Sequence, residues 1–154
     1  MDVRFINPVL RSIVNVLSTM ATLDPQIGTP VIKQGVIASG IVTGIIDFKG
    51  PRINGSIAIS LAKPVILDIA QRMLSEPFTE IDEVILDLVG ELTNMMAGGG
   101  KATLSEQGYD FDLTLPRVLV GDGHEINHFI MAQTIIIPFR TDSGEFFVEI
   151  CFKA

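Results

Sequence analysis

Two carboxylates and one carboxamide recur at helical spacing in the stretch Asp87-Leu-Val-Gly-Glu91-Leu-Thr-Asn94. On a helix of about 3.6 residues per turn, these three positions lie within roughly 60° of arc, so their side chains face one partner. Carboxylates accept hydrogen bonds and pair with cations, whereas a carboxamide both donates and accepts and so is able to orient a water molecule. The row fits docking or water-directed chemistry, although such a row, taken alone, is more often the solvated face of an amphipathic helix.

The helix that must carry this row has a clear apolar side. Thr79 is a suitable N-cap with Asp82 or Glu83 in the first turn, and the helix should run past Asn94 toward Lys101. The run Gly98-Gly-Gly100 either breaks this helix or lets another helix approach it closely. The apolar residues on the arc opposite the row are Ile81, Ile85, Leu88, Leu92 and Met96.

A second candidate motif is His124-Glu-Ile-Asn-His128, which has the H-E-x-x-H spacing of zinc hydrolases. That chemistry needs a helix, on which two imidazoles one turn apart bind the metal and the glutamate acts as general base. Here the five residues follow the turn-forming Gly121-Asp-Gly123 and lead into a β-branched run. We interpret them as solvated turn residues and not as metal ligands, even though Glu145 or Glu149 would be available as a third ligand.

A third candidate, Gly98-Gly-Gly-Lys101, superficially suggests a phosphate-binding loop. A P-loop needs a glycine where Met95 stands and a serine or threonine where Ala102 stands, and it joins a strand to a helix. This segment follows a helix. We therefore interpret it as part of the helix and predict no bound cofactor.

Composition indicates one packed domain over residues 1–154. A chain of 154 residues with 47% hydrophobic and 19% charged residues and a mean hydropathy of +0.45 buries a single core, with apolar surface to spare for self-association. The net charge of −7 repels phosphate backbones and anionic lipid. We expect a protein partner or a small ligand, and neither nucleic acid nor a membrane.

The single cysteine, Cys151, lies in a strand-like run from Phe146 to Phe152 and has no partner for an internal disulfide. This fits a reducing compartment, and a small packed hydrophobe is the favoured interpretation. The sequence shows no clear export signal and no apolar run of the roughly 18 residues that a membrane span needs. We expect a cytoplasmic protein.

The remaining elements alternate in a simple order. Apolar spacing predicts a first helix from Ile6 to Met20, or one that begins at Asp2 and is kinked at Pro8. The β-branched runs predict a hairpin with strands over residues 34–48 and 56–61. A second helix begins at Lys63-Pro64 and ends at residue 73 or 74. Further strands are predicted over residues 115–120, 128–139 and 145–152. The order α-β-β-α-α-β-β-β predicts an α+β fold, a mostly antiparallel sheet with helices packed on it.

The chain resembles the CheC/CheX/FliY family of chemotaxis phosphatases over nearly its whole length. The likeness lies in Glu91-Leu-Thr-Asn94-Met-Met-Ala-Gly98, preceded by Asp87 and followed by Pro116-Arg-Val-Leu-Val120. Because Glu-x-x-Asn occurs once only, the chain is most similar to the single-motif CheX branch. The resemblance implies a CheC-like fold, with Glu91 and Asn94 as the catalytic pair and Asp87 in substrate docking.

The resemblance also implies a substrate, the aspartyl phosphate of a CheY-like response regulator. Phosphoryl transfer to water depends on in-line placement of the water more than on a strong base, so Asn94 would orient the nucleophile. Glu91 would bind the lysine of the regulator's active site. The Mg²⁺ that the reaction needs is expected in the regulator, and none in this protein.

Two alternatives stay open from the sequence. The same fold resembles the middle domain of flagellar switch proteins, in which case Asp87, Glu91 and Asn94 are contact residues of a non-catalytic docking module. The resemblance further implies a homodimer. The apolar run Ile135-Ile-Ile137 with Phe139 either continues the sheet between subunits or is buried in the monomer's own core.

Overall fold

One antiparallel sheet and three helices make up residues 3–154, the part of the chain that the computed structural model describes. The helices are α1 (Val3–Ala21), α2 (Lys63–Leu74) and α3 (Glu83–Glu106). The long strands are β3 (Val42–Lys49), β4 (Asn54–Leu61), β7 (Ile135–Thr141) and β8 (Gly144–Lys153). The short strands are β1 (Gln26–Ile27), β2 (Val31–Ile32), β5 (Asp112–Leu113) and β6 (Arg117–Val120).

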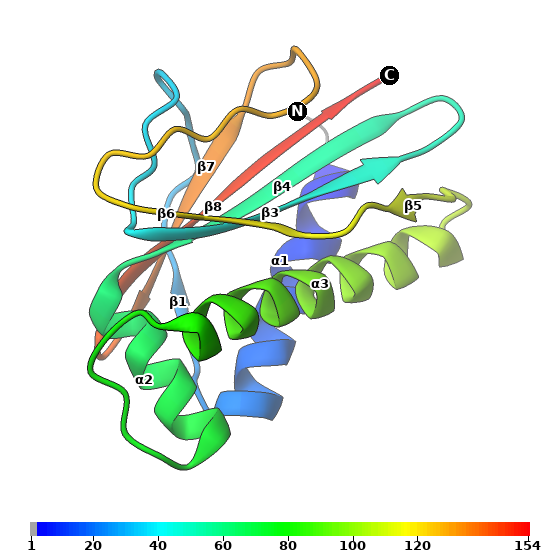
Figure 1. The fold of residues 1–154 in the computed structure, drawn as a ribbon. Helices are drawn as coiled ribbons and strands as arrows, with labels where there is room; N and C mark the ends of the chain where they lie inside the picture. The colour runs from blue at the N-terminus through cyan, green and yellow to red at the C-terminus, as the bar shows by residue number, and fades with distance from the viewer. Residues whose placement is uncertain (1–2) are drawn as a thin grey trace.

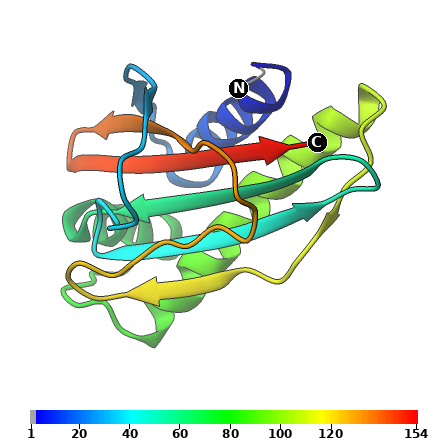
Figure 2. The same ribbon diagram turned by 90° about the horizontal axis from the view of Figure 1, so that it is seen from above.

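The sheet has its helices on one face and connections on the other. The strand order is β1-β7-β8-β4-β3-β5, with β2 paired to β7 and β6 to β3, and every pairing is antiparallel. All three helices cover the same face (Figure 1). The connections before β3 and between β6 and β7 cross the opposite face (Figure 2), where a backbone bridge joins Ile37 to Glu125. The predicted α+β fold is confirmed.

The central hairpin forms as predicted, but its first strand begins later in the chain than expected. β3 pairs with β4 from Val42–Leu61 to Lys49–Asn54, and nearly every residue of both strands is buried because the sheet is covered on both faces. The prediction that Val36 and Ile37 belong to this strand is wrong, since both are exposed and Ile37 makes only its isolated bridge.

The predicted strands near the C-terminus are confirmed with one correction. β6 and β8 lie within or close to the expected ranges, whereas β7 begins at Ile135 and residues 128–134 form no strand. The apolar composition of that stretch suggested a strand, but there the chain crosses the sheet face as a loop. β1, β2 and β5 were not predicted, because two residues are too few to show an alternating pattern.

The first two helices differ little from expectation. α1 includes Pro8, so the alternative of an early start is correct, although the predicted first residue, Asp2, lies outside the described residues. α1 ends at Ala21, three residues before Asp24. α2 runs from Lys63 to Leu74 with a proline in its first turn, as predicted.

Candidate functional site

The helix that carries the polar row begins at Glu83, and its N-cap is Asp82. The Asp82 carboxylate accepts a hydrogen bond from the Ile85 backbone N–H at 3.0 Å. The predicted cap at Thr79 is therefore wrong, and Ile81 precedes the helix instead of lying on its apolar side. Asp82, which was predicted to lie in the first turn, is the cap instead, so the helix begins later in the chain than predicted.

The rotation of α3 on the sheet is set by contact between Thr93 and β3. Thr93 is buried, and its hydroxyl donates to the Val89 carbonyl at 2.7 Å. Its side chain rests on Gly44, where a Cβ atom would collide with the Thr93 Oγ1. Because successive helical residues are turned by about 100°, a threonine held against the sheet directs Asn94 away from it.

The row therefore lies on the outside of the molecule. Asp87, Glu91 and Asn94 are all exposed. The opposite side of the helix is buried against the core at Ile85, Leu88, Leu92 and Met96. The predicted division of this helix into a core side and a displayed side is confirmed for these residues.

The three consecutive glycines do not interrupt α3, which continues to Glu106. A Cβ on Gly99 would collide with the Ser12 Oγ of α1, and one on Gly100 would lie 3.1 Å from a Val9 methyl group. The Ser12 hydroxyl donates to the Met96 carbonyl at 2.7 Å. The glycines thus allow close packing of α1 on α3, the second of the two predicted alternatives.

Beside the row, α3 lies along β6 (Figure 1). A Cβ on Gly90 would lie 3.6 Å from a Val118 methyl group and 4.0 Å from the Pro116 Cγ. The segment that leads into β6 therefore borders the turn of α3 that holds Glu91.

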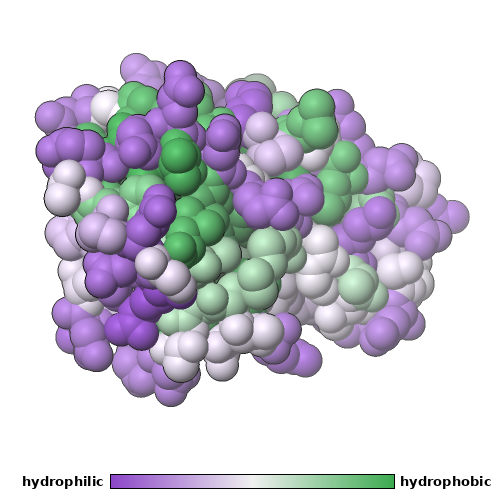
Figure 3. Space-filling view, turned by 60° about the horizontal axis from the view of Figure 1, so that its bottom comes forward, coloured by the Kyte–Doolittle hydropathy of each residue, from purple (hydrophilic) through white to green (hydrophobic). Residues whose placement is uncertain are grey.

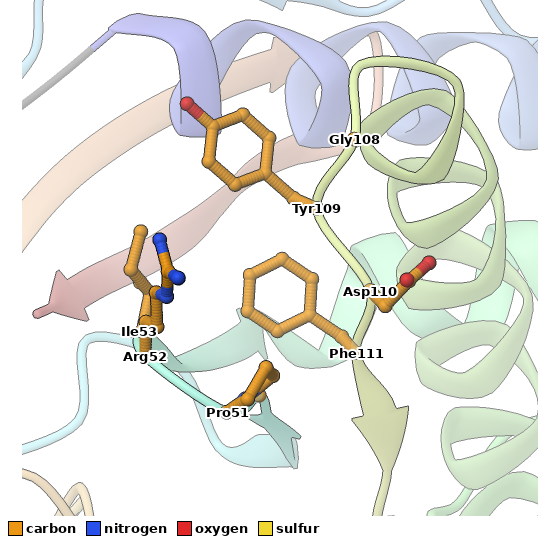
Figure 4. A pocket seen from close by; sticks show the side chains of 8 residues that line it. Pro51, Arg52, Ile53, Gly108, Tyr109, Asp110 and Phe111 are labelled. Carbon is orange, nitrogen blue, oxygen red and sulfur yellow. The ribbon is translucent and has the colours of Figure 1, made fainter.

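A small hollow lies away from this row. It has a volume of about 220 Å³ and is formed by the β3–β4 turn and the segment after α3 (Figure 4), with lining residues that include Arg52, Tyr109 and Phe111. The helix-covered side of the molecule is largely hydrophilic, with hydrophobic residues gathered toward its middle (Figure 3). The row does not line this hollow, and Asp87, Glu91 and Asn94 are exposed on the surface of α3.

The two histidines of the H-E-x-x-H stretch lie in the connection between β6 and β7, as the turn signals predicted, and not on a helix. Both histidines are only partly exposed, however, so the prediction of solvated turn residues is wrong for them, whereas Glu125 and Asn127 of the same stretch are exposed. His124 Nε2 lies 2.6 Å from Thr43 Oγ1, and His128 Nδ1 lies 2.6 Å from Ser56 Oγ. Each ring is bound to the sheet by a different partner.

His128 also belongs to a buried charge cluster. Its Nε2 lies 2.9 Å from Glu149 Oε1, and Lys33 Nζ lies 2.5 Å from Glu149 Oε2. The side chains of His128 and Lys33 are 7% exposed, and that of Glu149 is 1% exposed. Burial alone would lower the pKa of His128, but hydrogen bonds and charge interactions with Cys151 and Glu149 outweigh it and raise the pKa from 6.5 to about 9. The cluster ties two distant connections to β8.

Within residues 3–154, no group of three or more His, Cys, Asp or Glu side chains is arranged to hold a metal ion. None of the described helices is both long and apolar enough to cross a bilayer.

The antiparallel sheet, the helices on one face and the exposed Glu-x-x-Asn row define a CheC-like domain. A family model described as "Chemotaxis phosphatase CheX" matches residues 42–140, and the chain belongs to this family. The chain is 29% identical over 131 residues to "CheY-P phosphatase CheX" of Thermotoga maritima, covering 84% of this chain and 83% of that protein.

Two solved structures are also similar to this chain in sequence and fold. A CheC-like superfamily protein from Shewanella sp. PV-4 is 45% identical, covers 100% of both chains and superposes with a TM-score of 0.94. CheX in the CheX–CheY–BeF3–Mg²⁺ complex from Borrelia burgdorferi is 25% identical with a TM-score of 0.82, covering 97% of this chain and 98% of that one.

Proposed function

We propose that this protein hydrolyses the aspartyl phosphate of a CheY-like response regulator, with Asn94 and Glu91 as the catalytic pair. Two observations support the proposal. The chain belongs to a family of chemotaxis phosphatases, and both side chains are exposed on one side of α3. The exposure of Asn94 is the observation that carries it, because a partner's phosphoryl group is accessible only to a side chain that projects from the surface.

Asn94 orients the attacking water. The transition state of phosphoryl transfer is loose, so the placement of the nucleophile in line with the leaving oxygen matters more than the strength of the base. A carboxamide accepts a hydrogen bond from the water and donates another to a phosphoryl oxygen. Being neutral, it enters an acidic, metal-containing pocket without repulsion.

Glu91 forms an ion pair with the lysine of the regulator's active site, and Asp87 assists docking one turn earlier. Once the interface excludes water, a carboxylate–ammonium contact sets the register of the two proteins more firmly than an exposed ion pair does. The position of Glu91 one helical turn before Asn94 allows both side chains to enter the same pocket.

The divalent cation belongs to the regulator. The Borrelia burgdorferi complex contains CheY, BeF3 and Mg²⁺ together with CheX. In the proposed reaction, the regulator's Mg²⁺ neutralises charge on the phosphoryl group, and this chain supplies Asn94 and Glu91. The reaction takes place in the cytoplasm.

Regulator dephosphorylation kinetics tests the proposal. Each CheY-like regulator of the same genome is phosphorylated with a small phosphodonor, and phosphate release is followed with and without this protein. The proposal expects a shorter phosphoryl lifetime for at least one regulator. Binding of a phosphorylated regulator with an unchanged lifetime would instead identify a docking module of the flagellar-switch type, the alternative that the sequence left open.

The protein is further proposed to act as a homodimer. β7 is not a free edge, because β8 flanks one side and β1 and β2 the other, and Ile137 and Phe139 are fully buried within the monomer. Exposed apolar side chains gather instead on the segment before β3, each 40 to 55% exposed: Ile27, Val31, Ile32, Val36 and Ile37. Sedimentation of the wild type and of Ile37→Asp tests this contact, and a wild-type monomer at all concentrations contradicts it.

A further inference from the structure

Gly98 is a glycine in the interior of α3 that the packing of the helix does not require. Gly99 and Gly100 allow α1 to pack closely, but a Cβ on Gly98 would meet no atom of residues 3–154 within 4 Å apart from its own turn of the helix. Its backbone is helical, without the positive φ that favours glycine. Because glycine destabilises the interior of a helix relative to alanine, this position needs another explanation.

Gly98 lies one turn after Asn94 on the same side of α3. The helix is continuous through both positions, and the Cβ positions of residues four apart on a helix are about 5–6 Å from each other. The four nearest helical neighbours of Asn94 are Gly90, Glu91, Ala97 and Gly98. Ala97 is buried and the glycines have no side chain, so of these four only Glu91 extends a side chain from the surface.

The bare backbone beside Asn94 matters because an asparagine side chain is short. Its carboxamide is attached directly to Cβ and extends only a small distance beyond the helix. To orient a water molecule against a phosphoryl group inside a partner's pocket, the backbone of α3 must itself come close to the partner. A side chain one turn away on the same side would meet the partner first and hold the helix back. Glycine allows the approach.

We propose that Gly98 is a positioning residue, whose bare backbone lets α3 approach the phosphorylated regulator closely enough for Asn94 to place the attacking water. This inference rests on the proposed function, because the regulator is the partner that α3 approaches. A displacement of about 1 Å between reacting groups can lower a rate by about 100-fold. The helix thus gives up stability at this position for activity.

The test compares Gly98→Ala and Gly98→Leu with a matched control, Ala102→Leu. Ala102 is exposed on α3, eight residues after Asn94, so the control adds a leucine to the same helix about 12 Å farther along. Alanine and leucine both favour the helix. For each protein, kcat and KM for the phosphorylated regulator, the affinity for regulator loaded with BeF3⁻ and Mg²⁺, and the melting temperature are measured. Asn94→Ala is measured beside them.

The proposal expects Gly98→Leu to lower kcat by about tenfold or more, and Gly98→Ala to lower it by a smaller factor. Both variants should melt at a higher temperature than the wild type, because the glycine is replaced by a better helix former in open space. Ala102→Leu should keep kcat within about twofold of the wild type. A purely structural role for Gly98 would instead make stability and kcat fall together.

A wild-type kcat in Gly98→Leu, or an equal loss in Ala102→Leu, would overturn the positioning role. A weaker affinity with unchanged kcat at saturation would overturn it as well, because the leucine would then hinder docking without moving Asn94. If the wild type is active, Asn94→Ala is inactive and Gly98→Leu keeps its full kcat, the proposed function stands and this inference alone fails. A wild type that shortens no regulator's phosphoryl lifetime overturns both.

Discussion

Thr93 of α3 packs directly onto Gly44 of β3, so closely that position 44 has no room for a side chain. This contact determines which side of α3 faces the sheet and therefore directs Asn94, the next residue, to the surface. The catalytic geometry proposed for the row depends on a glycine nearly fifty positions earlier in the chain.

Gly44→Ala should therefore destabilise the protein and impair its activity. The added methyl group forces α3 away from β3, at a cost of about 1–3 kcal/mol in the free energy of unfolding. Urea denaturation measures the loss. Adding Thr93→Ala removes the hydroxyl that the methyl group meets, so the double variant should lose less than the sum of the two single losses; strict additivity would show that the two residues do not collide.

Two of the three consecutive glycines of α3, Gly98 and Gly99, should respond differently to alanine. A Cβ on Gly98 meets nothing within 4 Å outside its own helix, so Gly98→Ala should raise the free energy of unfolding by about 1 kcal/mol through helix propensity. Gly99→Ala should lower it, because the methyl group collides with Ser12 of α1. Equal shifts of the two melting temperatures would contradict the packing described for α1 and α3.

Asn94→Ala should abolish stimulated dephosphorylation and leave the fold intact. The side chain is exposed, so its loss creates no cavity and no buried polar group. Stopped-flow measurement of regulator-phosphate decay should give the regulator's intrinsic rate, with a melting temperature equal to that of the wild type. A decay rate unchanged by the substitution would remove Asn94 from catalysis.

Glu91→Ala should weaken binding as well as turnover, and Glu91→Lys should weaken both further. Removing the carboxylate leaves the regulator's lysine unpaired at the interface, a loss of about 2 kcal/mol or more, and the added lysine introduces repulsion. Titration with BeF3⁻-loaded regulator at two salt concentrations measures the effect. If affinity is undiminished while turnover falls, Glu91 acts on the reaction and not on docking.

Stability should decrease at alkaline pH because of His128. Its pKa is raised from 6.5 to about 9 in the folded state, so folding favours the protonated form. The stabilisation is fully present below pH 6.5 and is lost as pH rises through about 9, on the order of 3 kcal/mol.

Urea midpoints between pH 6 and pH 10 measure this dependence, and His128→Gln should remove most of it. Cys151→Ala should remove part of the dependence, because the thiol is one of the groups that raise the pKa of His128, and Lys33 remains in both variants. A wild-type stability that is flat over this range would show that His128 is not held as a cation by Cys151 and Glu149.

The sequence alone determined the main helices, the central hairpin and the polar row, because each is encoded by local spacing. The apolar positions of α3 repeat at helical period, and the row occupies the remaining arc, so the core and outer sides of that helix follow without any knowledge of its neighbours. The same holds for β3 and β4, whose β-branched runs are separated by turn residues. The CheX resemblance also rests on local motif residues.

Tertiary structure decided what depends on partners that are distant in the chain. Whether the three glycines break α3 depends on Ser12 and Val9, which pack against them from α1. Whether His128 is solvated depends on Glu149 of β8 and Ser56 of β4, whose side chains bind it from the sheet face that its loop covers. A sequence pattern reports the preference of a segment for one conformation, whereas burial and close contact depend on which other segments fold against it.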